Sequence, residues 1–276
     1  MGRLRDDFAA LVAPGERTHL GRAALAIARI AYPTLDPGSS LARLDELATA
    51  VRPRLPSGAP PEAGLEELTA YLFDECGFRG NREEYYDPRN SYLNDVLERR
   101  IGIPITLSVL LIEVGARLGL PLEGVGFPGH FLVRLNGTRG PVLLDPFFGG
   151  RLLGESELLA RYCSYRGADV PALPRDALAP TGTPALLARM LRNLLHIYLE
   201  RRDHAAALLA TDLLLVLQPE SAGEVRVRGL LHERLECFGA ALEDFQRYLA
   251  LAPEAPDAED IRERVTRLVR AAATIH

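Results

Sequence analysis

A histidine and an aspartate stand at the ends of two neighbouring β-type runs. His130 directly precedes the run at 131–135, and Asp145 directly follows the run at 142–144. If the runs pair as strands, the carboxylate can accept from one imidazole nitrogen, which fixes the tautomer and favours protonation. The pair would then provide acid–base chemistry, with His130 as base and Asp145 orienting it. A structural hydrogen bond between two strands explains the same residues equally well.

A polar and aromatic loop precedes this region and could line a pocket beside the pair, because loop residues often carry binding. Helix capping and loop closure account for some of its residues without a ligand, and Asn90 or Ser91 is expected to cap the helix that runs to Arg100. Arg79, Arg89 and Arg134 could hold a carboxylate together, although ordinary salt bridges explain them as well. The candidate binding residues in the loop are Tyr85, Tyr86, Asp87, Arg89, Asn90 and Asn94.

The remaining histidines and the cysteines do not predict a metal site or a cofactor. The three cysteines, Cys76, Cys163 and Cys237, are far apart in the sequence and lack C-x-x-C spacing. We therefore expect neither a disulfide framework nor a zinc site. His19, His196, His204 and His232 also lack ligand spacing to one another, apart from the two in the first helical repeat. We therefore expect no metal and no cofactor.

The residues before the candidate pair read as helices. Apolar residues recur at helical spacing over 20–30, 41–51 and 65–76, and the proline-rich stretch 52–64 reads as a loop. A strongly apolar helix is expected over 105–118, closed by Gly119. This helix should form the centre of the core.

After residue 121 the apolar period changes to two. Short runs at 122–127, 131–135 and 142–144 are separated by glycine-containing turns. An antiparallel sheet packed on the central helix is the simplest assembly, so an α+β fold is expected over 1–167. The segment 168–184, rich in Pro, Gly and Ala, is the expected linker, and 185–276 reads as all helix.

The helical part repeats itself at an offset of 34 residues, which aligns Pro219 with Pro253 and Ala207 with Ala241. This is the period of tetratricopeptide (TPR) repeats. Small residues at the crossing allow the two helices of a repeat to approach closely. Two repeats and a terminal helix over 258–273 are too few for a long groove, so structural packing and peptide binding are equally open for this array.

The order of the central helix, the Gly129-His130-Phe131 strand and the strand ending at Asp145 is similar to the core of the transglutaminase-like superfamily, a papain-like fold. The resemblance implies a Cys–His–Asp triad whose cysteine begins the central helix, where the dipole favours thiolate. His130 and Asp145 match two members. The cysteine position falls on Pro104, which has no nucleophile but suits the first position of a helix.

Three other residues carry a hydroxyl or thiol that could substitute for the missing nucleophile. Ser108 lies one turn further along the central helix, and Thr106 points to a different side, so neither replaces the cysteine naturally. Cys76 belongs to a different helix, and a plain buried thiol explains it better. The triad is therefore expected to be degenerate.

Over almost the whole length the chain resembles the bacterial SirB-type transglutaminase-like/TPR proteins. That resemblance implies a fold and an architecture, but no established reaction. The motifs that carry it are at 77–81, 85–97, 100–105, 126–131 and 145–147, with Gly149-Gly150.

Composition narrows the possible partners. A net charge of -5 disfavours nucleic-acid binding, and no secretory signal or membrane-spanning run is present, so we expect a cytoplasmic protein. The sequence predicts a non-catalytic protein that binds a peptide or protein partner. The alternatives are a hydrolase or acyl transferase acting on amide bonds through His130 and Asp145, with another nucleophile or water attacking, and a scaffold without a cleft.

Overall fold

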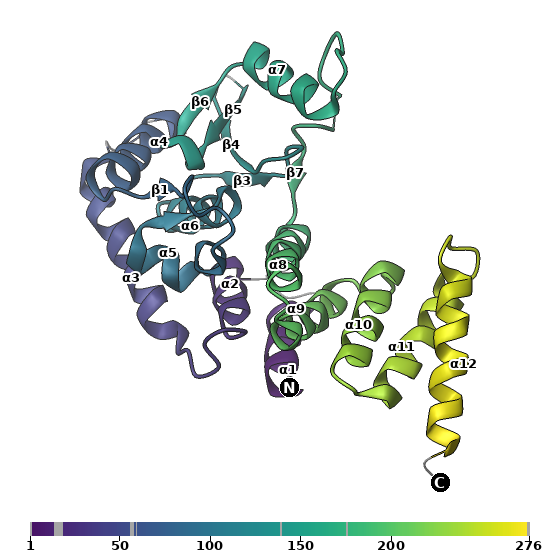
Figure 1. The fold of residues 1–276 in the computed structure, drawn as a ribbon. Helices are drawn as coiled ribbons and strands as arrows, with labels where there is room; N and C mark the ends of the chain where they lie inside the picture. Colours follow the sequence, from purple (N-terminus) through teal and green to yellow (C-terminus); the bar gives the residue numbers. More distant parts are fainter. Residues whose placement is uncertain are drawn as a thin grey trace. The chain divides into compact units, whose positions relative to one another are not determined.

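The computed structural model describes residues 2–13, 19–55, 58, 60–138, 140–174 and 176–274. The chain forms two compact units, one comprising 16–190 and the other joining 1–15 to 191–276 (Figure 1). The expected linker at 168–184 therefore falls inside the first unit. The division into domains 1–167 and 185–276 stays a prediction.

The helices of the first unit surround one buried helix, α6 (Pro104–Arg117). Pro104 takes its first position, where the missing N–H costs nothing. Contacts with four helices and three strands of this unit place α6 at the centre, as expected. The helices before it are α2 (Leu20–Ala28), α3 (Pro37–Val51), α4 (Pro61–Thr69) with a π-helical turn η2 (Ala70–Glu75), and α5 (Leu93–Arg99).

Two local predictions in this part were wrong. The expected loop over 52–64 contains the 3-10 turn η1 (Arg52–Arg54) and the start of α4, since a proline can occupy the first position of a helix. Asn90 and Ser91 do not cap α5, whose N-cap is Tyr92 without a side-chain hydrogen bond. Asp87 instead caps the preceding 3-10 turn η3 (Pro88–Ser91) by accepting from the Arg89 N–H.

A five-stranded antiparallel sheet lies beside α6, in the strand order β6-β5-β4-β3-β7. Its strands are β3 (Leu122–Val125), β4 (Leu132–Gly137), β5 (Gly140–Asp145), β6 (Arg151–Leu153) and β7 (Pro180–Thr181). The expected antiparallel sheet on the central helix is confirmed. The outer strands β6 and β7 were not expected, and neither was a parallel pair of two-residue strands, β1 (Arg79–Gly80) and β2 (Ile101–Gly102).

Helices cover both faces of the sheet. Leu122 of β3 packs so closely on α6 that a Cβ at Gly115 would lie 2.4 Å from its side chain. Val125 points to the opposite face, because side chains alternate along a strand, and there it joins Leu158 of α7 (Glu155–Arg166) in one apolar cluster. The strands that carry His130 and Asp145 are therefore held between two helical layers.

The second unit consists of helices, and its fold confirms the predicted tetratricopeptide repeats. A Cβ at Gly229 would lie 2.7 Å from the buried ring of Phe245, which shows how closely α10 and α11 approach. The unit also contains α1, whose Phe8 is fully buried. Its helices are α1 (Gly2–Leu11), the end of α8 (Thr183–Glu200), α9 (His204–Leu217), α10 (Ala222–Arg234), α11 (Phe238–Leu251) and α12 (Ala258–Thr274).

Candidate functional site

The structure joins the two residues at the strand ends. His130 lies just before β4, Asp145 is the last residue of β5, and the two strands pair with Val133 opposite Leu144. His130 Nε2 lies 2.8 Å from Asp145 Oδ1, a hydrogen-bond distance. The aspartate side chain is fully buried, whereas 17% of the histidine side chain is exposed. The imidazole is thus partly exposed to solvent, and its buried side is hydrogen-bonded to a carboxylate.

Asp145 has two further hydrogen-bond donors. Arg161 Nη1 on α7 donates to Asp145 Oδ2 at 2.8 Å, and the Phe147 N–H donates to Asp145 Oδ1 at 3.2 Å. Burial alone would raise the pKa of Asp145, but its hydrogen bonds and charge interactions with His130 and Arg161 hold the pKa below its usual range. An ionised carboxylate only accepts, so Nε2 of His130 donates and Nδ1 is the remaining ring nitrogen.

Aromatic rings surround the imidazole. Phe147 and Phe148 of the short turn η4 (Pro146–Phe148) each have their ring centroid 6.1 Å from that of His130. The ring centroid of Tyr85 lies 6.0 Å from that of Phe147, so one predicted binding residue contacts the rings that surround His130. Tyr86 packs edge-on against Tyr85 at 5.3 Å, and its side chain is 63% exposed. These rings give the site an apolar wall.

Two arginines that sequence reasoning missed hold the site in shape. Arg161 pairs with Asp145, as described above, and Arg189 Nη2 donates to the main-chain oxygens of His130 at 2.6 Å and Phe127 at 3.3 Å. Burial lowers the pKa of Arg189, and the nearby Tyr85 and Tyr165 oppose that shift. No spacing in the sequence connects these arginines to His130, so no local signal could have identified them.

The start of α6 lies on the same side of the unit as the residues after Asp145. Strand β2 leads directly into Pro104 and pairs with β1, and a Cβ at Gly80 of β1 would meet the Phe147 ring at 2.4 Å. Pro104 is buried.

The hydroxyls of α6 are bonded to main-chain oxygens. Ser108 Oγ donates to Pro104 O at 2.8 Å, and Thr106 Oγ1 donates to Asn90 O at 2.5 Å. Within the described ranges, the one hydrogen-bond partner of the His130 ring is Asp145. Neither hydroxyl is therefore placed for activation by His130.

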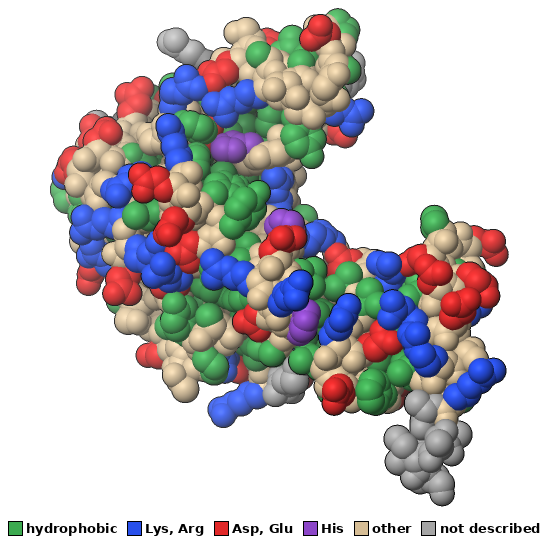
Figure 2. Space-filling model, viewed as in Figure 1, with side chains coloured by type: hydrophobic (Ala, Val, Ile, Leu, Met, Phe, Trp, Pro, Cys, Tyr) green, Lys and Arg blue, Asp and Glu red, His purple; other side chains and the backbone are tan. Residues whose placement is uncertain are grey.

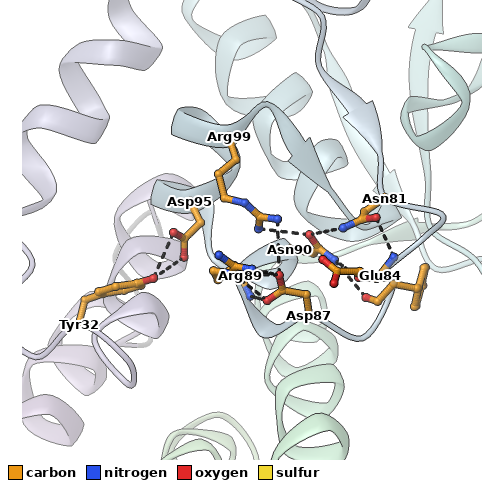
Figure 3. A network of polar contacts seen from close by, with 9 residues as sticks. Tyr32, Asn81, Glu84, Asp87, Arg89, Asn90, Asp95 and Arg99 are labelled. Carbon is orange, nitrogen blue, oxygen red and sulfur yellow. Dashed lines mark hydrogen bonds and ion pairs between the residues drawn. The ribbon is translucent and has the colours of Figure 1, made fainter.

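Three of the six predicted loop residues, Asp87, Arg89 and Asn90, close their own loop, as Figure 3 shows. Asp87 is buried and accepts from Arg89 Nε at 2.9 Å and from Arg99 Nη2 at 3.5 Å. Asn90 Nδ2 donates to Glu84 O at 2.7 Å. Burial would raise the pKa of Asp87, but hydrogen bonds to Arg89 and the charges of Arg89 and Arg99 lower it. These hydrogen bonds and ion pairs therefore fix the shape of the loop, and a role of Asp87, Arg89 and Asn90 in binding stays a prediction.

The other predicted binding residues are distributed differently. The Oδ1 atom of Asn94 is buried and has no hydrogen-bond partner in the described part of the chain. Arg79 lines a pocket beside β1, whereas Arg134 donates to Asn136 Oδ1 at 2.9 Å, and Arg89 is engaged with Asp87. Arg79, Arg89 and Arg134, which the sequence suggested could hold one carboxylate together, thus have separate surroundings.

The described ranges contain no group of three or more His, Cys, Asp or Glu side chains suited to a metal ion. Across those ranges, no helix combines the length and the apolar character that crossing a membrane requires.

A His–Asp pair at the ends of two strands of an antiparallel sheet that packs on a buried helix is the arrangement of the transglutaminase-like class, and the 34-residue helix pairs are those of tetratricopeptide repeats. Family models agree: residues 39–192 match the transglutaminase-like superfamily, and residues 194–266 match the tetratricopeptide repeat. The chain belongs to the family of transglutaminase-like proteins with C-terminal tetratricopeptide repeats that includes SirB1 and the UPF0162 proteins.

The relatives cover nearly the whole chain. A UPF0162 protein of Xylella fastidiosa is 41% identical over 251 residues, which are 89% of this chain and 88% of the relative. Protein SirB1 of Salmonella typhimurium is 29% identical over 249 residues, covering 90% and 91% of the two chains. UPF0162 protein YchA of Escherichia coli K12 is 28% identical over 245 residues, covering 89% and 90%. No solved structure matches this chain significantly.

Proposed function

We propose that this protein binds a peptide segment of a protein partner without transforming it, and that the His130–Asp145 pair belongs to the binding site. The observation that carries the proposal is at the nucleophile position of the fold, where a buried proline begins the central helix. A covalent acyl intermediate needs a thiol or hydroxyl activated by the base. Ser108 and Thr106, the nearest hydroxyls on that helix, donate to main-chain oxygens.

The surroundings of His130 suit a peptide. Its Nδ1 atom is the ring nitrogen not bonded to Asp145, so it can accept from a peptide N–H. Tyr85, Phe147 and Phe148 offer aromatic faces for apolar side chains. Tetratricopeptide repeats in the same chain are consistent with a role in protein interaction. Cytoplasmic location is part of this proposal.

An enzyme remains the second candidate, because the His130–Asp145 hydrogen bond is intact. In this alternative His130 would be the base that takes a proton from water, and Asp145 would orient the ring and stabilise its charged form. The substrate would be an amide bond of a peptide. The two candidates differ in whether a bound peptide is returned unchanged.

Photo-crosslinking at the site tests the proposal. Benzoylphenylalanine replaces the exposed Tyr86, and matched probes replace the exposed Arg22 on α2 and Phe238 on α11. We expect a discrete adduct from the Tyr86 probe and none from the Arg22 probe. The captured segment is then synthesised and incubated with wild type and His130→Ala, and its mass should stay unchanged with both.

Three results would count against this function. Cleavage or deamidation of the peptide that His130→Ala abolishes would establish the enzyme. Equal yields at Tyr86 and Arg22 would remove the binding site. An adduct at Phe238 alone would transfer binding to the repeats and favour a scaffold role for the first unit.

A further inference from the structure

A basic pocket adjoins the His130 site. It has a volume of about 530 Å³ and is formed by β1, the start of β2, the turn η4 and the residues next to them. Phe147 and Phe148, whose rings lie beside His130, also line this pocket, so the two features share a wall. Figure 2 shows basic side chains gathered over the region of β5 and β6, close to a histidine side chain.

The pocket holds more positive charge than its own carboxylate balances. Arg79, Arg82 and Arg151 line it, with Glu83 as the one acidic lining residue. Arg151 forms an ion pair with Glu157. Arg79 and Arg82 have no carboxylate partner among the described residues. Two arginines without a carboxylate partner among the described residues therefore line one cavity.

An aromatic ring orients the guanidinium group of Arg82. Its guanidinium carbon lies 4.6 Å from the centroid of the Phe148 ring, so the planar group stacks on an aromatic face. Stacking uses the face of the guanidinium and leaves its N–H edge for hydrogen bonding. That edge matches the two oxygens of a carboxylate, and the pre-set orientation reduces the entropy lost on binding.

The lining suits an anion next to an apolar group. Glu83 offsets part of the attraction that the arginines exert on an incoming anion. The rings of Phe147 and Phe148 can pack against an apolar or aromatic side chain close to the bound anion.

We infer that this pocket binds a carboxylate of the partner peptide whose neighbouring main chain passes His130. The inference rests on the proposed function and adds the chemistry of the ligand. The carboxylate can be the terminal one or that of an acidic side chain, and the two sources are separable.

Titrations of the full chain with small probes, followed by amide NMR signals, test the inference. N-acetylphenylalanine provides a carboxylate and a ring, and N-acetylphenylalanine amide lacks only the charge. We expect the acid to shift Gly80, Asn81 and Gly149 and to bind about tenfold more tightly than the amide. Acetyl-Phe-Glu amide distinguishes the sources: tight binding assigns acidic side chains, and weak binding assigns a terminal carboxylate.

Substitutions make the test specific. The double variant Arg79→Gln/Arg82→Gln should bind N-acetylphenylalanine about tenfold or more weakly than the wild type. Arg22→Gln, which removes an exposed arginine outside the pocket, should leave this affinity unchanged. Glu83→Gln should strengthen binding, because it removes the opposing charge. Circular dichroism should show both pocket variants folded like the wild type.

Several outcomes would overturn the inference. These are equal affinity for the acid and the amide, equal weakening by Arg22→Gln, and tighter binding of phenyl phosphate than of the acid. The amide signals of His130 and Phe131 separate this failure from that of the proposed function. If a peptide that carries a carboxylate shifts them without shifting Gly80, the peptide site exists and the carboxylate pocket is wrong.

Discussion

At the scale of single residues, Asp145 determines how the site is charged. The carboxylate is fully buried and receives hydrogen bonds from His130 and Arg161, so two potential cations share one anion. A buried carboxylate with such partners is strongly stabilised in its ionised form. The free-energy cost of burying the Asp145 carboxylate is offset only while His130 and Arg161 both remain hydrogen-bonded to it.

The lowered pKa of Asp145 predicts a loss of stability in acid. A carboxyl group whose pKa is lower when folded stabilises the fold above its unfolded pKa of about 3.9, and this contribution is lost as pH falls through the folded pKa. The wild-type urea midpoint should therefore fall between about pH 5 and pH 2. In Asp145→Asn this fall should be smaller, and stability at pH 7 should be lower by about 1–3 kcal/mol.

Asp169→Asn is the matched control, because this exposed side chain forms no ion pair with another described residue and its loss should leave the pH profile unchanged. Parallel profiles for wild type and Asp145→Asn would show that the carboxyl group is not ionised preferentially in the fold.

At the scale of elements, one glycine sets the spacing of two repeat helices. Gly229 of α10 faces the ring of Phe245 of α11, and a methyl group there would lie 2.7 Å from that ring. Phe245 is fully buried and belongs to the apolar cluster of this array, so the ring has little room to move. The residue is small because two helices meet at that point.

Gly229→Ala should lower the free energy of unfolding of the helical unit by about 1–3 kcal/mol through overpacking, although alanine favours a helix more than glycine does. Gly223→Ala lies in the same helix with no atom within 4 Å of the new Cβ. It should be neutral or stabilising by up to about 1 kcal/mol. Urea unfolding followed by circular dichroism measures both, and equal effects of the two substitutions would refute the close contact.

At the scale of the whole molecule, the two compact units are not simply the N-terminal and the C-terminal part of the chain. Helix α1 packs on α9 in the C-terminal unit, although the whole of the other unit, residues 16–190, lies between them in the chain. That insertion has the length of a typical domain. Phe8 of α1 is fully buried. The N-terminal segment thus contributes to the stability of the repeats.

Phe8→Ala should therefore destabilise the C-terminal unit by about 3–5 kcal/mol, as large-to-small changes in a core do. Hydrogen exchange measured by mass spectrometry should speed up in α9 and leave β4 and β5 unchanged. Phe238→Ala removes a ring from the same unit that is 48% exposed and should have little effect. Faster exchange in the strands instead would assign α1 to the other unit.

The sequence by itself determined the features that depend on neighbouring residues. Apolar periods located α2, α3 and α6, and the change of period located β3 to β5. The 34-residue offset identified the repeats. His130 and Asp145 were paired correctly because both stand at the ends of adjacent strands, so local pattern and sheet geometry coincide.

The tertiary structure alone decided how the site is completed. Arg161 reaches Asp145 from α7, a helix whose single fully buried residue, Leu158, gives no apolar stripe to detect. Arg189 reaches His130 across 59 residues, and the two-residue strands β1 and β2 are too short for any period. These contacts join segments distant in the chain, and their energies arise only once the core brings the segments together.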